Sequence, residues 1–239
     1  MLKSIKPKTP PTCTVVIAAA GISTRCEGED KLLYAVNGKP VIAYTVEAFE
    51  KCKPVNDIII VAHEDKVDIF GEICVKYGFK KVSLILKGGT TRLGSVLNGV
   101  YAASKKARLI AIHDGARPCV DVELINETIN KAAMYNAAAP AIAITSTIKK
   151  VADGAIVETV DREGLFEIQT PQIFRSELIK AALINADRKS IDITDDCMAV
   201  EVIGAKVFIT EGSRKNIKIT EPEDFELVKS FLNKDSGCL

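Results

Sequence analysis

The stretch VVIAAAGISTRCEGEDKLL, residues 15–33, gives the first indication of the fold, because an apolar run ends there at a glycine and gives way to a polar loop. The apolar run is continuous rather than alternating, which is typical of a strand buried on both faces of a parallel sheet. The loop carries one arginine, Arg25, and one lysine, Lys31. It matches neither GxGxxG nor GxxxxGK(S/T), so it is neither a dinucleotide fingerprint nor a Walker phosphate loop.

Four small residues at this junction would let a flat base or a phosphate approach the backbone closely: Ala18, Ala19, Ala20 and Gly21. Arg25 and Lys31 would then supply positive charge to the bound group. The alternative is a solvated loop of mixed charge, and the charges alone do not decide between the two interpretations.

Outward from this junction, strands and helices alternate. Further apolar runs of strand length occupy residues 57–63, 82–88, 108–114 and 139–145. Helical patterns lie between the successive runs, at residues 41–52, 64–78, 95–107 and 121–136. This alternation predicts an α/β fold, a three-layer, doubly wound, mostly parallel sheet of Rossmann-like type.

The alternation breaks at about residues 145–175, where β-branched runs flank an ADGA turn. This segment predicts a projecting β-hairpin arm. Because an arm is poorly buried by its own chain, we expect it to pack against a second subunit. Residues 1–12 are expected to be a disordered tail, and residues 13–234 one domain.

Composition limits the class of protein. The chain has 239 residues and a formal net charge of +1, which gives no reason to expect a nucleic-acid partner. No run approaches the roughly 18 apolar residues of a membrane span. Its seven cysteines contain no CxxC pair, so we expect a reducing, cytoplasmic compartment.

In open α/β sheets, ligands bind at the carboxyl ends of the strands. The polar residues and glycines just past the predicted strands are Gly21, Ser23, Thr24, Arg25, Lys31, Gly88, Gly89, Thr90, Thr91, Arg92, His113, Asp114, Arg117, Thr145, Ser146 and Thr147. Glycines, hydroxyls and cations around a carboxylate suit a phosphorylated ligand with a metal ion.

Taken one at a time, the residues at these positions indicate a function less clearly than the whole set does. Asp114 is a candidate metal or hydroxyl ligand, whereas His113 and His63 are expected to be structural. Thr194 is expected to be the N-cap of a helix, with the acidic residues after it favouring the helix start. Lys218 is unremarkable by itself.

Taken together, the motifs resemble those of the 2-C-methyl-D-erythritol 4-phosphate cytidylyltransferase family. They occur in the family's order over residues 14–232: AAAGISTR…K, GKPVIAYTVEAF, GG…R…SVLNGV, HDGARPCV, VDREGLFEIQTPQIF, TDD and NIKITEPED. The resemblance implies that CTP and methylerythritol phosphate give the CDP-linked alcohol and pyrophosphate with Mg²⁺, in the non-mevalonate isoprenoid precursor pathway. It also implies a homodimer whose arms reach into the partner's acceptor site.

The resemblance further implies roles for individual residues. The catalytic residues would be Arg25, Lys31, Arg162 and Lys218. The nucleotide would bind Ala18, Ala19, Ala20, Gly21, Gly88, Gly89, Thr90 and Ser95. The acceptor would bind Asp114, Arg117, Thr147, Arg162, Thr170, Thr194 and Lys218, and Asp114 would also be the metal ligand.

This chain departs from the family's usual pattern at several positions. Ser23 stands where a glycine is usual, DKLL stands where proline–lysine–glutamine is usual, and the loop before Lys31 is one residue shorter. Thr90 and Gly94 each replace a usual acidic residue, which bears on base selectivity. The rival interpretations are a ribitol-5-phosphate cytidylyltransferase, a sugar-1-phosphate nucleotidyltransferase and a nucleotide-binding protein without catalysis.

Overall fold

A computed structural model describes residues 12–21 and 30–235 of the chain. Its strands are β1 (Cys13–Ala19), β2 (Ala35–Val36), β3 (Lys39–Pro40), β4 (Val55–Ala62), β5 (Val82–Lys87), β6 (Leu109–Asp114), β7 (Ala137–Ala143), β8 (Ile148–Ala152), β9 (Ala155–Val160), β10 (Phe166–Ile168), β11 (Gln172–Arg175) and β12 (Phe208–Glu211). Its helices are α1 (Val41–Lys51), the 3₁₀ helix η1 (Glu64–Lys66), α2 (Val67–Tyr77), α3 (Arg92–Ala102), α4 (Val122–Tyr135), α5 (Ser176–Arg188), α6 (Asp196–Val202) and α7 (Glu223–Asp235).

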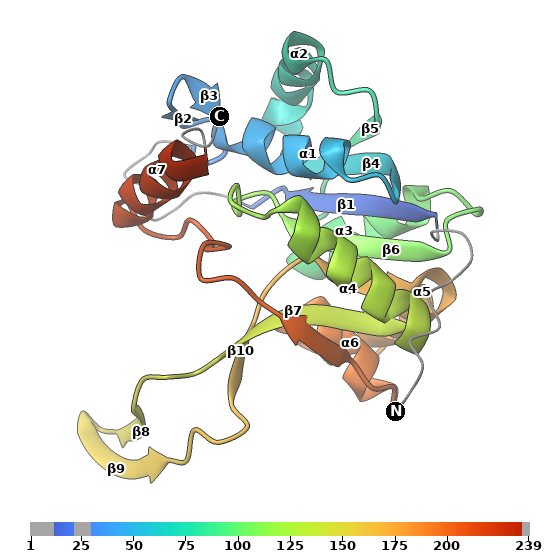
Figure 1. The fold of residues 1–239 in the computed structure, drawn as a ribbon. Helices are drawn as coiled ribbons and strands as arrows, with labels where there is room; N and C mark the ends of the chain where they lie inside the picture. Colours follow the sequence, from blue (N-terminus) through green and yellow to red (C-terminus); the bar gives the residue numbers. More distant parts are fainter. Residues whose placement is uncertain (1–11, 22–29, 236–239) are drawn as a thin grey trace, which may run out of the picture.

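Eight strands form the central sheet in the order β10-β7-β11-β6-β1-β4-β5, with β12 paired to β7 (Figure 1). The pairs that β1 makes with β4 and β6, and that β4 makes with β5, are parallel. The predicted α/β sheet is therefore confirmed. Among the described strands of the central sheet, antiparallel pairing involves only β10 and β11, which the continuous apolar pattern did not predict.

Side chains of the strands alternate between two hydrophobic clusters, one on each face of the sheet. In β1, Val15 and Ile17 pack in the cluster formed with α1, α2 and α4. Val16, between them, packs in the cluster formed with α3, α5 and α6. Because each central strand serves both clusters, its sequence is apolar over most of its length, and the sheet becomes the middle of three layers.

The chain order places a ligand crevice beside β1. From β1 the chain runs outward to β4 and then β5, and it returns through α3 to β6 on the other side of β1. This reversal of strand order is the topological switch point at which α/β sheets bind ligands. Gly21, Gly88 and Gly115 follow the ends of three of these strands and lie at the same edge of the sheet.

The arm is shorter than predicted. The hairpin of β8 and β9 turns at Asp153 and Gly154, both with positive φ, and extends away from the main sheet (Figure 1). Residues 166–175, which the sequence assigned to the arm, return to the central sheet as β10 and β11. They return because Ile173 and Phe174 are fully buried there.

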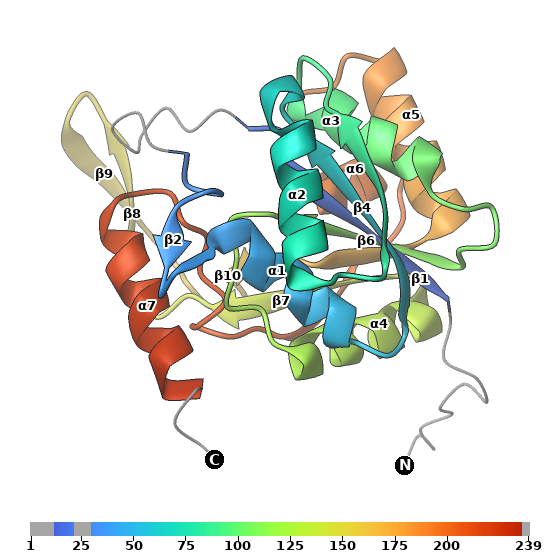
Figure 2. The ribbon, with the colours of Figure 1, turned by 90° about the horizontal axis from the view of Figure 1, so that it is seen from above.

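The two ends of the described chain both contact the rest of the fold. Residues 1–11 of the expected tail lie outside the described residues. Thr12, assigned to that tail, instead donates a hydrogen bond from its hydroxyl to the Lys106 carbonyl at 3.0 Å. At the other end, α7 lies beside the small β2–β3 sheet and away from α5 and α6 (Figure 2).

Candidate active site

A cavity of about 670 Å³ opens at the carboxyl ends of β1, β4, β5 and β6. Every residue predicted to bind the nucleotide lines it: Ala18, Ala19, Ala20, Gly21, Gly88, Gly89, Thr90 and Ser95. The structure therefore brings together two segments about 70 positions apart in the chain, at the edge where the sheet topology places a ligand.

The loop after β5 has room only for glycine. A Cβ on Gly88 would lie 2.5 Å from the Ala20 Cβ and 2.8 Å from the Ser95 Oγ. The Gly89 amide donates a hydrogen bond to that Ser95 hydroxyl at 3.1 Å. The loop is thus pressed against the end of β1, so that backbone atoms rather than side chains form this wall of the cavity.

The cavity is rich in cationic side chains. Lys31, Lys87, Arg92 and Lys218 line it, against two carboxylates, one of which is Asp114. This excess of positive charge matches a polyanionic ligand such as a triphosphate.

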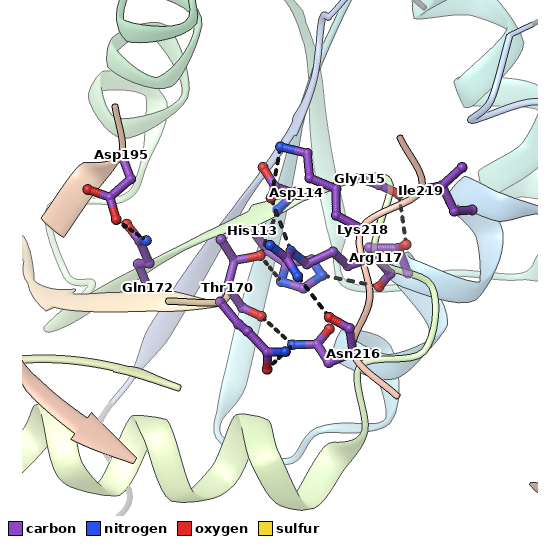
Figure 3. A network of polar contacts seen from close by, with 12 residues as sticks. His113, Asp114, Gly115, Arg117, Thr170, Gln172, Asp195, Asn216, Lys218 and Ile219 are labelled. Atoms are coloured by element: carbon purple, nitrogen blue, oxygen red, sulfur yellow. Dashed lines mark hydrogen bonds and ion pairs between the residues drawn. The ribbon is translucent and has the colours of Figure 1, made fainter. Parts of the chain in front are cut away.

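Asp114 is the most strongly perturbed acid in the cavity. Its Oδ2 lies 3.2 Å from Lys218 Nζ and 3.1 Å from Arg117 Nε (Figure 3). Burial acts to raise the pKa of this carboxyl, but Lys218 and Arg117 outweigh that effect and lower the pKa to about 2. Asp114 is therefore ionised throughout the physiological range.

Behind Asp114, a buried chain of hydrogen bonds fixes the end of β6 (Figure 3). The Asp114 amide donates to Thr170 Oγ1 at 3.1 Å, and this hydroxyl lies 3.0 Å from His113 Nδ1. His113 Nε2 lies 3.4 Å from the Arg117 carbonyl, which can only accept, so Nε2 carries the proton and Thr170 donates to Nδ1. Burial lowers the pKa of His113 to about 3, which keeps this tautomer neutral.

The segment that carries Lys218 is held by the same cluster. Arg117 donates from Nη1 to the Asn216 carbonyl at 2.8 Å, and the Asn216 amide group donates to the Thr170 carbonyl at 2.9 Å. The Ile219 amide donates to the Ala116 carbonyl at 2.9 Å. Lys218, a residue with no distinctive local pattern, is thereby fixed against the end of β6.

Arg92 forms a second buried network that the sequence did not predict. Its guanidinium binds the fully buried Asp196 carboxylate with two nitrogens, at 3.2 and 2.7 Å. Burial raises the pKa of Asp196, and Arg92 offsets part of that rise. Gln172 accepts from the Asp196 amide at 3.0 Å and donates to Asp195 at 2.7 Å.

The cap of α6 differs from the prediction. Asp195, and not Thr194, is the N-cap, because its carboxylate accepts from the Met198 amide at 2.9 Å. Thr194 is exposed and contacts the Met198 sulfur at 3.7 Å. The TDD motif thus serves to start α6 and to hold Arg92.

A second cavity of about 450 Å³ shares Lys218 with the first. Arg117, Arg214 and Gln169 line it, together with Glu167. Of the predicted acceptor residues, Lys218 therefore lies between the two hollows, and Arg117 lines the second one.

The other predicted site residues lie elsewhere. Thr170 is buried behind Asp114, whereas Thr147 and Arg162 are exposed near the base of the arm. Arg162 donates from Nη1 to the Thr145 carbonyl of its own chain. Arg25 lies outside the described residues. Lys31 donates from Nζ to the Ile219 carbonyl at 3.1 Å, beside Lys218.

No group of three or more histidine, cysteine, aspartate or glutamate side chains within residues 12–21 and 30–235 has the arrangement of a metal site. Asp114 is one ionised carboxylate in a cavity suited to phosphates, and Mg²⁺ is commonly held by one or two carboxylates together with substrate phosphates. The residues present fit that mode of binding.

The fold and the cavity define a class: an α/β nucleotide-binding protein with a cationic site for a phosphorylated ligand at the switch point of its sheet. Comparison with known proteins narrows this class. The family model described as 2-C-methyl-D-erythritol 4-phosphate cytidylyltransferase matches residues 13–234. The chain belongs to this family.

Individual relatives agree with the family match. A protein of Clostridium acetobutylicum with that name is 41% identical over 226 residues, which cover 94% of this chain and 98% of the relative. One of Caldanaerobacter subterraneus is 41% identical over 228 residues, or 92% of this chain and 99% of the relative.

Solved structures share the fold over most of the chain at lower sequence identity. The 4-diphosphocytidyl-2C-methyl-D-erythritol synthase of Anaerococcus prevotii superposes with a TM-score of 0.83 at 30% identity and covers 94% of this chain and 100% of its own. The 2-C-methyl-D-erythritol 4-phosphate cytidylyltransferase of Thermus thermophilus has a TM-score of 0.76 at 27% identity, with 93% and 99% covered.

Proposed function

We propose that this chain transfers the cytidylyl group of CTP to 2-C-methyl-D-erythritol 4-phosphate, giving CDP-methylerythritol and pyrophosphate. The observation that carries the proposal is the convergence of Lys31 and Lys218 beside the ionised Asp114, in a cavity walled by glycine backbone. Family membership supplies the identity of the two substrates.

The reaction needs no protein nucleophile. The acceptor phosphate attacks the α-phosphorus of CTP in line, and pyrophosphate leaves. Negative charge on the phosphoryl oxygens must be stabilised in the transition state, and fixed cations lower the barrier most effectively where water is excluded. Lys31 and Arg25 are assigned to this role.

We assign each of the two substrates to one of the two cavities. The glycine loop around Gly88 receives the nucleotide in the larger hollow, and the smaller hollow receives the acceptor. Lys218 lines both, so it is suited to orient the acceptor phosphate toward the nucleotide. Arg117 neutralises Asp114 from the acceptor side.

Mg²⁺ is proposed as the cofactor, with Asp114 as its protein ligand. When bound, the ion would neutralise charge on the triphosphate and favour the departure of pyrophosphate. Asp114 is held ionised and oriented for this purpose by Lys218 and Arg117.

The arm supports the proposal of a homodimer. Val151, Ile156 and Val157 are exposed by more than half on a hairpin that pairs with no other strand in the described part of the chain. Burial of such side chains is the usual driving force for association. In the dimer, Thr147 and Arg162 of one chain would complete the acceptor site of the other.

A cytoplasmic location is proposed on the state of the cysteines, since Cys13, Cys52, Cys74 and Cys197 are buried thiols without disulfides. Within the described part of the chain, no helix has both the length and the apolarity to cross a membrane.

The test is a pyrophosphate-release assay with CTP and Mg²⁺, using methylerythritol phosphate or ribitol 5-phosphate as the acceptor. Release with methylerythritol phosphate alone supports the proposal. Release with ribitol 5-phosphate alone would keep the mechanism but replace the acceptor. No release with either, from a protein that binds CTP, would identify a binder without catalysis.

A further inference from the structure

The segment that carries Lys31 begins at an aspartate that organises the backbone around it. The amides of Leu33 and Tyr34 both donate to the Asp30 carbonyl at 2.9 Å. The Leu32 amide donates to the Asp30 side chain, at Oδ1, at 2.8 Å. This is a turn in which the aspartate side chain stands in for a backbone acceptor, so Asp30 fixes the backbone of residues 30–34, within which Lys31 lies.

The second oxygen of the same carboxylate reaches a different part of the fold. Asp30 Oδ2 forms an ion pair with Lys66 Nζ, at the start of α2. The side chains of Asp30 and Lys66 are only 16% and 17% exposed, so the pair is shielded from water more than an ordinary surface pair. Its attraction is correspondingly less screened by solvent.

Lys66 belongs to a short helical turn that borders the cavity. Its amide donates to the His63 carbonyl at 3.0 Å, and it ends the 3₁₀ helix that follows β4. His63 and Glu64, from the same turn, line the larger cavity. The ion pair therefore ties the Lys31 segment to the carboxyl end of β4.

On its other side, the segment is fixed by packing. Leu32 is 3% exposed in the main hydrophobic cluster, and its carbonyl accepts from the Ile42 amide at 3.0 Å. From this backbone, Lys31 extends to the Ile219 carbonyl. The position of the Lys31 ammonium thus depends on two anchors, Leu32 in the core and Asp30 on Lys66.

We propose that Asp30 and Lys66 form a positioning pair that sets the placement of the Lys31 ammonium over the nucleotide cavity. The inference rests on the proposed function, because it gives Lys31 a role in turnover. Asp30 and Lys66 act through Lys31 and touch no substrate. A misplacement of a catalytic group by about 1 Å can cost on the order of 10²-fold in rate.

The variants are chosen to remove charge while preserving shape. Asp30→Asn keeps an oxygen that can accept from the Leu32 amide but removes the negative charge. Lys66→Met keeps the aliphatic stem but removes the ammonium. Lys66→Arg restores the charge. Lys51→Met, which breaks the exposed pair with Glu47 (3.1 Å), is the matched control.

We expect Asp30→Asn and Lys66→Met each to lower kcat roughly ten-fold, with little change in Tm. The double variant should lose no more than either single one, since both break the same pair. Lys66→Arg should restore most of the rate, and Lys51→Met should leave it unchanged. In a Lys31→Ala background, Asp30→Asn should have no further effect, which a purely structural brace would not produce.

Two results would overturn the inference and keep the proposed function: normal kcat in both single variants, or an undiminished effect of Asp30→Asn in the Lys31→Ala background. Full turnover by Lys31→Ala itself would overturn the inference together with the role assigned to Lys31. The assay is pyrophosphate release from CTP by the full chain.

Discussion

Arg92 and Asp196 are 104 residues apart in the chain, yet the guanidinium of one binds the carboxylate of the other through two nitrogen–oxygen contacts. Asp196 is fully buried, whereas the Arg92 side chain is 37% exposed and lines the nucleotide cavity. The pair joins the start of α3 to the start of α6. Asp196 thus holds the Arg92 guanidinium from the protein interior, and the exposed part of the Arg92 side chain remains open to the cavity.

Asp196→Asn is expected to lower the free energy of unfolding by about 1–2 kcal/mol, because the Arg92 guanidinium loses its charged partner but is partly solvated. CTP affinity should fall with it, since Arg92 loses its fixed position. Urea unfolding and CTP titration measure the two effects. Glu226→Gln, which breaks an exposed pair with Lys229 (3.9 Å), should change neither. Equal losses in both variants would contradict the role of the buried pair.

His113 predicts a pH dependence of stability. In the folded chain its pKa is about 3, whereas in the unfolded chain it is near 6.5. Below pH 6.5 the unfolded state therefore binds a proton that the folded state does not, so acidification favours unfolding. Between pH 6.5 and 5, the free energy of unfolding should fall by roughly 1 kcal/mol per pH unit. Asp114 contributes only at lower pH, because its pKa falls from 3.8 to about 2 on folding.

The measurement is the free energy of unfolding at several pH values for wild type, His113→Gln and His63→Gln. The slope should disappear in His113→Gln, whatever that change does to stability at pH 7. It should persist in His63→Gln, because His63 lies at the cavity rim and not in the core. The same slope in all three proteins would show that another group is responsible.

Gly88→Ala tests the backbone wall of the cavity. The new Cβ would lie 2.5 Å from the Ala20 Cβ, so the loop must move away from the end of β1. We expect the Kd for CTP to rise at least roughly ten-fold, a loss of about 1.4 kcal/mol. The control is Gly71→Ala in α2, where the new Cβ meets nothing within 4 Å and should stabilise the helix by about 0.5–1 kcal/mol. Unchanged CTP binding by Gly88→Ala would reject the close-approach argument.

The contrast between predicted and unpredicted features has a physical cause. Strands and their helices were predictable because burial on both faces leaves a continuous apolar run, as in Val15, Val16 and Ile17. The place of Asp114 at the cavity was predictable because the carboxyl ends of parallel strands meet at one edge, and Lys31 was a candidate because it lies in the loop that follows such an end. The Arg92–Asp196 pair was not predictable, because a contact between segments far apart in the chain produces no periodic pattern in the local sequence.

Local competition explains the smaller differences. Thr194 and Asp195 are both good N-caps in sequence, and only the geometry of α6 selects Asp195. The predicted arm was too long because it included β11, a short antiparallel strand of the central sheet. The β-branched and aromatic residues of β11 are equally typical of a hairpin and of a sheet, so the sequence pattern does not distinguish the two.

Charge stabilisation predicts the effect of removing the assigned cations. Arg25→Ala and Lys31→Ala should each slow turnover by about 10²–10³-fold, the usual cost of losing a fixed donor to a transition-state anion. The fold should survive, so Tm by thermal unfolding serves as the control beside kcat for pyrophosphate release. Normal turnover in either variant would remove that residue from the catalytic assignment.

The arm makes a prediction that distinguishes sites within one chain from sites shared between two. Arg162→Ala should raise KM for the acceptor more than KM for CTP, because Arg162 is assigned to the acceptor. If the arm acts on the partner subunit, a dimer of one Arg162→Ala chain and one Lys31→Ala chain contains one site with both residues intact. Unfolding and refolding the two variants together should then give, at low acceptor concentration, more activity than the average of the two variants refolded separately. If mixed refolding gives only the average of the two separate activities, Arg162 serves the site of its own chain, as its bond to the Thr145 carbonyl would permit.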